Sequence, residues 1–171
     1  MYKIYLLALG LLVSFQSESQ TESLPKFEFE NYSLPTALVI SVKNKDEKQL
    51  KQRVQRWINS FYTDTTLLDS TEGKSEFEIT GKSMRLLKIK NLPTDLKYDL
   101  KISLRNDKYR LEISSLAYKY YTEYREISDV NLNKDKIIKQ DLLESRQIIA
   151  SFINTLNTNL YKSITEDYNE W

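Results

Sequence analysis

Apolar and polar side chains alternate over residues 36–43, where Leu38, Ile40 and Val42 are the regular apolar positions. A repeat of two residues is typical of a β-strand with one buried face. Val39 indicates that the second face is partly buried as well. The pattern therefore predicts a first strand at the start of a folded domain that begins at Thr36.

The apolar repeat then lengthens to helical spacing, which predicts a helix from residue 45 to residue 62. Asn44 and Glu47 form the pattern of an N-cap and its capping partner. The apolar stripe of this helix consists of Leu50, Val54, Trp57, Ile58 and Phe61. We expect the stripe to lie on a sheet, with Trp57 in the core and the opposite face in solvent.

Two strands are predicted after this helix, a short one at Leu67-Leu68 and, after a turn at residues 72–74, a longer one over Glu76–Leu87. Gly81 lies in the middle of the longer strand and indicates either a bulge or a close approach by the first helix. Leu92-Pro93 is expected to end this run.

A β-hairpin follows, because strict alternation over residues 98–104 and 109–113 flanks the polar turn at 105–108. The last predicted element is a long C-terminal helix whose apolar stripe contains Leu142, Ser145, Ile149, Phe152, Ile153, Leu156 and Leu160. The order is thus strand, helix, four strands, helix. We assign residues 36–165 to one α+β domain, residues 20–35 to a linker or edge segment, and residues 166–171 to a polar tail.

Three short sequences within that order resemble a known family: Trp57-Ile58, the stretch 78–82 (EITGK) and the stretch 107–110 (DKYR). They are similar to an uncharacterised exported bacterial family, the domain of unknown function described as having a TBP-like fold. The resemblance covers residues 36–113 well and the last helix by pattern alone. It implies a β-α-β-β-β-β-α fold, in which a curved antiparallel sheet carries two helices on one face. It implies no activity, cofactor or catalytic residue, and a fold by itself is no argument for DNA binding.

The first nineteen residues have the pattern of a signal peptide. Lys3 is the positive residue, Ile4–Phe15 is an apolar run too short to span a bilayer, and Ser17-Glu18-Ser19 offers small residues for cleavage before Gln20. We therefore expect export to the periplasm or the medium, with the mature chain starting at Gln20. No later segment has the length and hydropathy of a membrane span.

The chain contains neither cysteine nor histidine. Catalytic systems built on Ser-His-Asp or Cys-His are therefore excluded, as are structural zinc sites and disulfides. The formal net charge is +1 with both signs interspersed, so no strong field attracts nucleic acid. We expect no cofactor, no metal and no nucleic-acid partner.

The best candidate contact residues are four tyrosines close to Arg125: Tyr118, Tyr120, Tyr121 and Tyr124. In a strand, Tyr118 and Tyr120 would share one face while Tyr121 took the other. Exposed tyrosines beside charged residues bind sugars or anchor protein partners. The alternative is structural, because tyrosine is a common strand residue whose ring covers the edge of a core.

Carboxylates offer two weaker candidates. Glu76 and Glu78 share one strand face at a spacing compatible with acid and base roles on a glycosidic bond, although the solvated side of a half-buried strand is the better interpretation. Asp129, Asn131, Asn133 and Asp135 resemble the opening of a calcium loop. Lys134 and Gln140 stand where that loop needs Gly and Glu, so a polar connection is the better interpretation.

Basic side chains on the first helix, Lys48, Lys51, Arg53 and Arg56, are offset by Asp46 and Glu47 and fit an ordinary solvated face. We conclude that the chain is an exported, non-enzymatic binding domain with no catalytic residue, whose contact surface is its sheet or the tyrosine-rich segment and whose partner is an envelope protein or a glycan. A carboxylate-dependent hydrolase of envelope or dietary glycans and a structural envelope component are the alternatives. The oligomeric state stays open.

Overall fold

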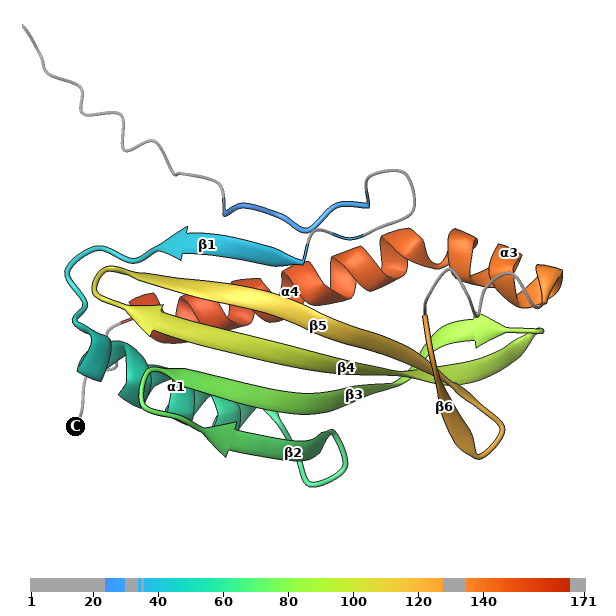
Figure 1. Ribbon diagram of the computed structural model, residues 1–171, viewed down its shortest axis with the longest axis horizontal. Coiled ribbons are helices and arrows are strands. Elements are labelled where there is room, and N and C mark those ends of the chain that lie inside the picture. The colour runs from blue at the N-terminus through green and yellow to red at the C-terminus, as the bar shows by residue number, and fades with distance from the viewer. Residues whose placement is uncertain (1–23, 30–33, 35, 128–134, 167–171) are drawn as a thin grey trace, which may run out of the picture.

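The alternating stretches of the chain form one open antiparallel sheet in the computed structural model, which describes residues 24–29, 34, 36–127 and 135–166. The strand order is β1-β5-β4-β3-β2, and β6 pairs with β5 off this path (Figure 1). The strands are β1 (Ala37–Ser41), β2 (Leu67–Glu72), β3 (Glu76–Ile89), β4 (Leu92–Arg105), β5 (Lys108–Tyr120) and β6 (Glu123–Glu126). The helices are α1 (Glu47–Phe61), α3 (Lys136–Glu144) and α4 (Arg146–Thr165).

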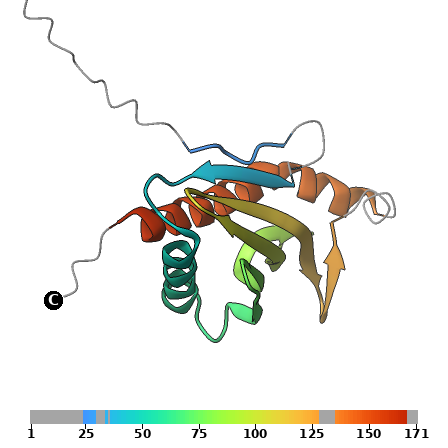
Figure 2. The same cartoon turned by 60° about the vertical axis from the view of Figure 1, so that its left-hand side comes forward.

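One face of the sheet forms the core, as one-sided alternation requires. In β4 the inward side chains are at most 2% exposed: Leu96, Tyr98, Leu100, Ile102 and Leu104. Helix α1 buries Leu50, Val54, Trp57 and Ile58. Helices α1 and α4 pack against each other and lie on the same face of the sheet (Figures 1 and 2). The predicted α+β class, with helices on one face of an antiparallel sheet, is confirmed.

Helix α1 starts two residues later than predicted and has a different cap. Asp46 is the N-cap, and it forms a capping box in which its side chain accepts from Gln49 N at 2.7 Å while Gln49 Oε1 accepts from Asp46 N. Asn44 has φ 62°, whereas an N-cap residue needs extended backbone. The proposed cap of Asn44 with Glu47 is therefore wrong, because Asn44 serves the preceding turn.

Gly81 makes room for an aromatic ring rather than for the first helix. A Cβ at Gly81 would lie 2.6 Å from both Cζ and Oη of Tyr98, its partner across β3 and β4. A register shift between Leu67 and Asp69 of β2 lies opposite Gly81, so the expected bulge is present on the neighbouring strand. The expected approach by the helix is wrong.

Strands β3 and β4 form a longer hairpin than the sequence indicates, with 14 residues in each strand. Leu92 and Pro93 begin β4 rather than end β3, and they pair with Ile89 and Lys88. Lys90 and Asn91 turn the chain with φ values of 49° and 66°, as a tight hairpin of matching twist requires.

The C-terminal helix is divided at Ser145 into α3 and α4. The predicted stripe lies along both, with Leu142 buried on α3 and Ile149, Ile153, Leu156 and Leu160 buried on α4. Asp135 caps α3 by accepting from the backbone of Ile137 and Ile138. Strand β6 and helix α3 were not predicted as separate elements.

Residues 24–29, in the proposed linker or edge segment, pack on α4 and form no strand. Phe27 is fully buried, and the Asn154 side chain pairs with both its N–H and its C=O at 2.8 and 2.9 Å. The predicted signal peptide, its cleavage site and residues 167–171 lie outside the described residues. Within the described residues, no helix has the length and apolar character to cross a membrane.

Candidate functional site

The sheet divides into two hairpins at the end that carries the tyrosines. Strands β4 and β5 pair only as far as Leu96 and Tyr118. Beyond these residues β4 pairs with β3 alone, while β5 pairs with β6 alone. The hairpins diverge (Figure 1) and line a depression of about 530 Å³, which we call the fork groove.

A bulge in β3 shapes one wall of the fork groove. The register passes from Ser83 opposite Leu96 to Leu87 opposite Thr94, so that three residues of β3 face Asp95 alone. Arg85, in the middle of the bulge, has φ 52° and donates its N–H to Asp95 Oδ1 at 2.9 Å. Bulges re-aim side chains, and this one leaves Met84 57% exposed.

The fork groove is lined by apolar side chains that are not buried in the core. Met84, Leu92 and Tyr121 are 57%, 61% and 77% exposed, and all three line it together with Pro93. They are three of the seven large hydrophobic side chains that are exposed in the described part of the chain. Such clustering, unlike scattered exposed apolar residues, is typical of a contact surface.

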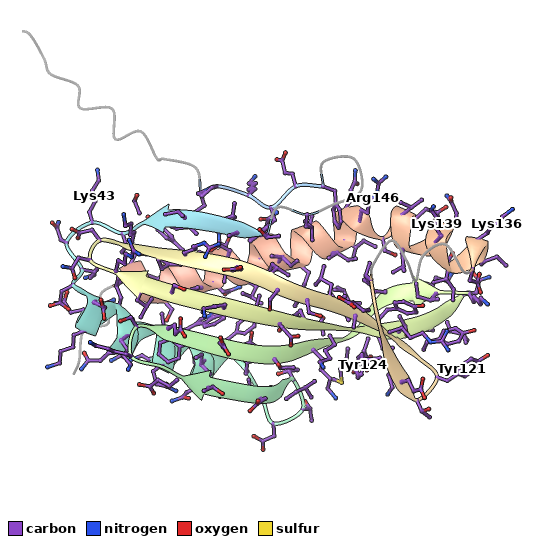
Figure 3. All side chains as sticks on the ribbon, viewed as in Figure 1. Lys43, Tyr121, Tyr124, Lys136, Lys139 and Arg146 are labelled. Carbon is purple, nitrogen blue, oxygen red and sulfur yellow. The ribbon has the colours of Figure 1, made fainter. Side chains whose placement is uncertain are left out.

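The four predicted tyrosines take different places around the groove. Tyr120 and Tyr121 line it, with ring centroids 4.6 Å apart and planes at 75°. Tyr121 follows the end of β5 with φ 55° and points away from the sheet (Figure 3). Tyr118 is 4% exposed and contacts Tyr120 from the core side.

Tyr124 does not line the fork groove. It pairs with Lys119 from β6, and Figure 3 shows it on the other side of the hairpin from Tyr121. Burial raises the pKa of the Tyr124 phenol, and the carboxylate of Asp95 raises it further. The structure therefore brings two of the four predicted tyrosines together at an open site, with Tyr118 buried behind them.

Positive charge dominates the groove wall. Arg85, Lys90 and Lys119 line it against one carboxylate, Asp95. Lys90 Nζ lies 2.7 Å from Asp135 Oδ2 and 3.5 Å from the Tyr120 hydroxyl, and these contacts raise the pKa of the Lys90 ammonium. The guanidinium of Arg125 lies 4.2 Å from the centroid of the Tyr120 ring and covers it as a cation–π contact.

Sequence reasoning missed the β3–β4 wall of the groove, formed by Met84, Arg85, Leu92 and Pro93. Two signals pointed to it. Alternation fails over residues 84–87, where a bulge lies, and Lys90-Asn91 is a polar dipeptide at a hairpin turn. Nothing local predicts that this wall lines the same groove as Tyr121, because the two hairpins are separate in the sequence and meet only in the folded molecule.

The carboxylates considered for catalysis lie elsewhere, on the open face of the sheet. Glu76 Oε2 and Glu78 Oε1 both bind Lys101 Nζ, at 2.9 and 3.2 Å. Both side chains are substantially exposed, and neither lines the fork groove or the depression beside α4. Their arrangement is that of a solvated ion-pair cluster.

The other candidates have structural partners where they are described. Asp135 caps α3 and pairs with Lys90, while residues 129–133 of the possible calcium loop lie outside the described residues. Lys51 binds Glu72 at 2.8 Å, and Arg53 donates to the carbonyl of Ile164 at the end of α4. Across the residues that the structure places, no three acidic, His or Cys side chains cluster as metal ligands would.

A second depression, of about 1060 Å³, lies between residues 26–29 and the outer face of α4. Its lining is mainly polar and includes Gln147, Ser151, Asn154, Thr155 and Thr158. The side chain of Asn154 is already hydrogen-bonded to the backbone of Phe27. This depression therefore lies where the N-terminal segment packs on α4.

Comparison with known proteins identifies the fold. No family model matches the chain, and no curated protein matches it. A TBP-like protein from Parabacteroides distasonis ATCC 8503 has a similar structure, with a TM-score of 0.57 and 15% identity over 80% of this chain and 96% of that one. A DUF4468 family protein from Bacteroides ovatus ATCC 8483 has a TM-score of 0.56 and 12% identity over 85% of this chain and 94% of the other. The resemblance drawn from the sequence is confirmed at the level of the fold: the chain has a TBP-like fold, like that of a Bacteroides protein from a family of unknown function.

Proposed function

We propose that this protein is an exported, non-enzymatic binding domain that holds an envelope protein or a glycan in the fork groove. The observation that carries the proposal is the gathering of Met84, Leu92 and Tyr121, all more than half exposed, around one concave site. Concave sites with apolar walls and a few polar groups are the usual places for ligands.

The open face of the sheet is a poorer contact surface, because its charges already pair with each other. Lys101 binds Glu76 and Glu78, and Arg110 binds Glu112 at 2.8 Å. Thr80 donates to Asp99 at 2.7 Å across β3 and β4. A partner on this face would have to separate groups that are already satisfied, which costs free energy.

The proposal is tested by capture from an envelope extract on immobilised mature protein. Tyr121→Asn removes the exposed ring, and asparagine adopts the left-handed backbone at this position more readily than most residues. We expect the captured amount of a specific partner to fall severalfold while the unfolding midpoint stays the same. Val39→Ser is the matched control, because Val39 is 59% exposed on β1 and lines neither depression.

Two results would contradict the proposal. Equal capture by the wild type and by Tyr121→Asn would place the contact outside the fork groove. Hydrolysis of a glycan that is abolished by Glu76→Gln or Glu78→Gln in a folded protein would replace a binding function with an enzymatic one.

A further inference from the structure

We propose that the part of the partner held in the fork groove is an acidic peptide segment with a large apolar side chain. This inference rests on the proposed function of the groove and adds the chemistry of what it binds. The groove itself contributes two complementary properties, unbalanced positive charge and exposed apolar side chains.

Three cations line the wall of the fork groove, Arg85, Lys90 and Lys119. Lys90 is paired with Asp135, whereas Arg85 and Lys119 have no salt bridge within the described residues. The one carboxylate, Asp95, already accepts the backbone N–H of Arg85. With Lys90 balanced by Asp135, two cations face one carboxylate, so the groove keeps one net positive charge, which carboxylates of a partner would complement.

The position of Lys119 is fixed by the fold. Its carbonyl accepts a hydrogen bond from the hydroxyl of Thr94, which joins the two hairpins at the base of the fork. Lys119 and Arg85 thus belong to opposite arms of the groove, β5 and β3, and the exposed apolar side chains line the same depression. An occupant that reaches both cations must therefore span the two arms of the groove.

The apolar part of the groove suits a peptide side chain better than a sugar. Arg125 covers the Tyr120 ring at 4.2 Å, which leaves Tyr121 as the well exposed ring of the pair. Met84 and Leu92 supply adaptable aliphatic surface, and methionine is common where varied side chains must be accepted. The lining contains one carboxylate, Asp95, and no amide side chain, so it offers few of the acceptors that commonly bind sugar hydroxyls.

The experiment uses a fluorescein-labelled synthetic peptide in which glutamates flank one tryptophan, and a control peptide in which glutamines replace the glutamates. Binding to the mature protein is measured by fluorescence anisotropy at low and at physiological salt. We expect the acidic peptide to bind, with an affinity that falls as salt rises, and the neutral peptide to bind much more weakly.

Charge variants locate the binding. The double variant Arg85→Gln with Lys119→Gln should raise the dissociation constant of the acidic peptide about tenfold, as the loss of two exposed ionic contacts implies. Lys48→Gln is the matched control, because Lys48 is exposed on α1 and lines neither depression. Tyr121→Asn should weaken the binding of the acidic peptide too.

Every other outcome overturns the inference. Equal binding of both peptides would show that charge is not recognised, and equal weakening by Lys48→Gln would show diffuse attraction. If neither peptide binds while partner capture still depends on Tyr121, the inference of an acidic ligand is wrong and the proposed function stands. Displacement of a captured partner by an oligosaccharide, but not by the acidic peptide, would show that the ligand is a glycan.

Discussion

Gly81 shows how a single residue sets the packing between β3 and the core. The ring of Tyr98 fills the space where a Cβ would stand, and its hydroxyl lies 3.4 Å from that of Tyr62. Burial, as the largest cause, raises the pKa of both phenols, so both stay protonated across the physiological range. The glycine therefore allows a pair of buried tyrosines to meet between the sheet and α1.

Gly81→Ala should destabilise the protein by about 1–3 kcal/mol, the usual cost of overpacking a core. Gly73→Ala is the comparison, because its Cβ would meet Cγ of Glu76 at 2.9 Å, and that side chain is 44% exposed and can turn away at the expense of an exposed ion pair with Lys101. Urea unfolding of the two variants measures the difference. Equal midpoints for Gly81→Ala and the wild type would mean that Tyr98 is not packed on Gly81.

Trp57 is the residue on which the contact between α1 and the core depends. It is 2% exposed, and its ring stacks on Phe61 at 5.2 Å and meets Tyr62 edge-on at 5.5 Å. Its indole N–H is buried without a hydrogen-bond partner among the described residues. Its contribution to stability is therefore one of packing.

Trp57→Ala should cost about 3–5 kcal/mol of unfolding free energy, which is typical of truncating a buried aromatic residue. Trp57→Phe should cost less, because it keeps a ring and removes the unpartnered N–H. Denaturant titration checks both. A loss below about 0.5 kcal/mol for Trp57→Ala, the size expected at a surface, would contradict the packing of α1.

Among the elements, α3 is held at the tip of the β3–β4 hairpin by an ion pair and a hydrogen bond. Asp135 caps the helix and binds Lys90 Nζ at 2.7 Å, while Asp141 accepts the N–H of Lys90 at 2.7 Å. The hydrogen bond from Lys90, followed by the one from Ile138 N, lowers the pKa of the Asp135 carboxyl. The same lysine lines the fork groove, so this joint also fixes one of its walls.

Asp135→Asn keeps a good N-cap and removes the ion pair, whereas Asp135→Ala removes both. The free energy of unfolding should therefore be highest for the wild type, lower for Asp135→Asn and lowest for Asp135→Ala. Because the pKa is lowered in the folded state, the advantage of the wild type over Asn exists above the unfolded pKa of about 3.9 and disappears as the pH falls through the folded value. An advantage that grows on acidification would contradict the ion pair.

Elements with a regular pattern were predictable from the sequence, and those with a broken pattern were not. The β4–β5 hairpin follows from strict alternation around Arg105–Lys108. The tip of β3–β4 was missed because its bulge interrupts the alternation, and because Pro93 reads as the end of a strand. Strand β6 was missed because its four residues, Glu123–Glu126, are mostly charged and depend on pairing with β5.

The residues of the candidate site also differ in whether the sequence could predict them. Tyr120 and Tyr121 were identifiable as an aromatic cluster within one short segment. Met84 and Leu92 were not, because their exposure results from a bulge and a turn on another hairpin. A groove between two hairpins is a property of tertiary structure, and local periodicity carries no information about it.

At the scale of the whole molecule, the N-terminal segment completes the domain. Phe27 is fully buried on α4, so the folded domain needs it. Cleavage before Gln20 meets this condition, and we expect the exported product to have that N-terminus by intact-mass measurement. Full-length protein that still carries Met1 in a membrane fraction would contradict export with cleavage.

We propose the fork groove as the contact surface of this TBP-like domain. The most direct measurement is a chemical-shift map of isotope-labelled mature protein titrated with the captured partner. The predicted result is a set of shifted amides around Met84, Leu92 and Tyr121, on both hairpins, with little change at Lys101 on the open sheet face. Shifts that centre on Lys101, or on Asn154 of α4, with Tyr121 unchanged, would contradict it.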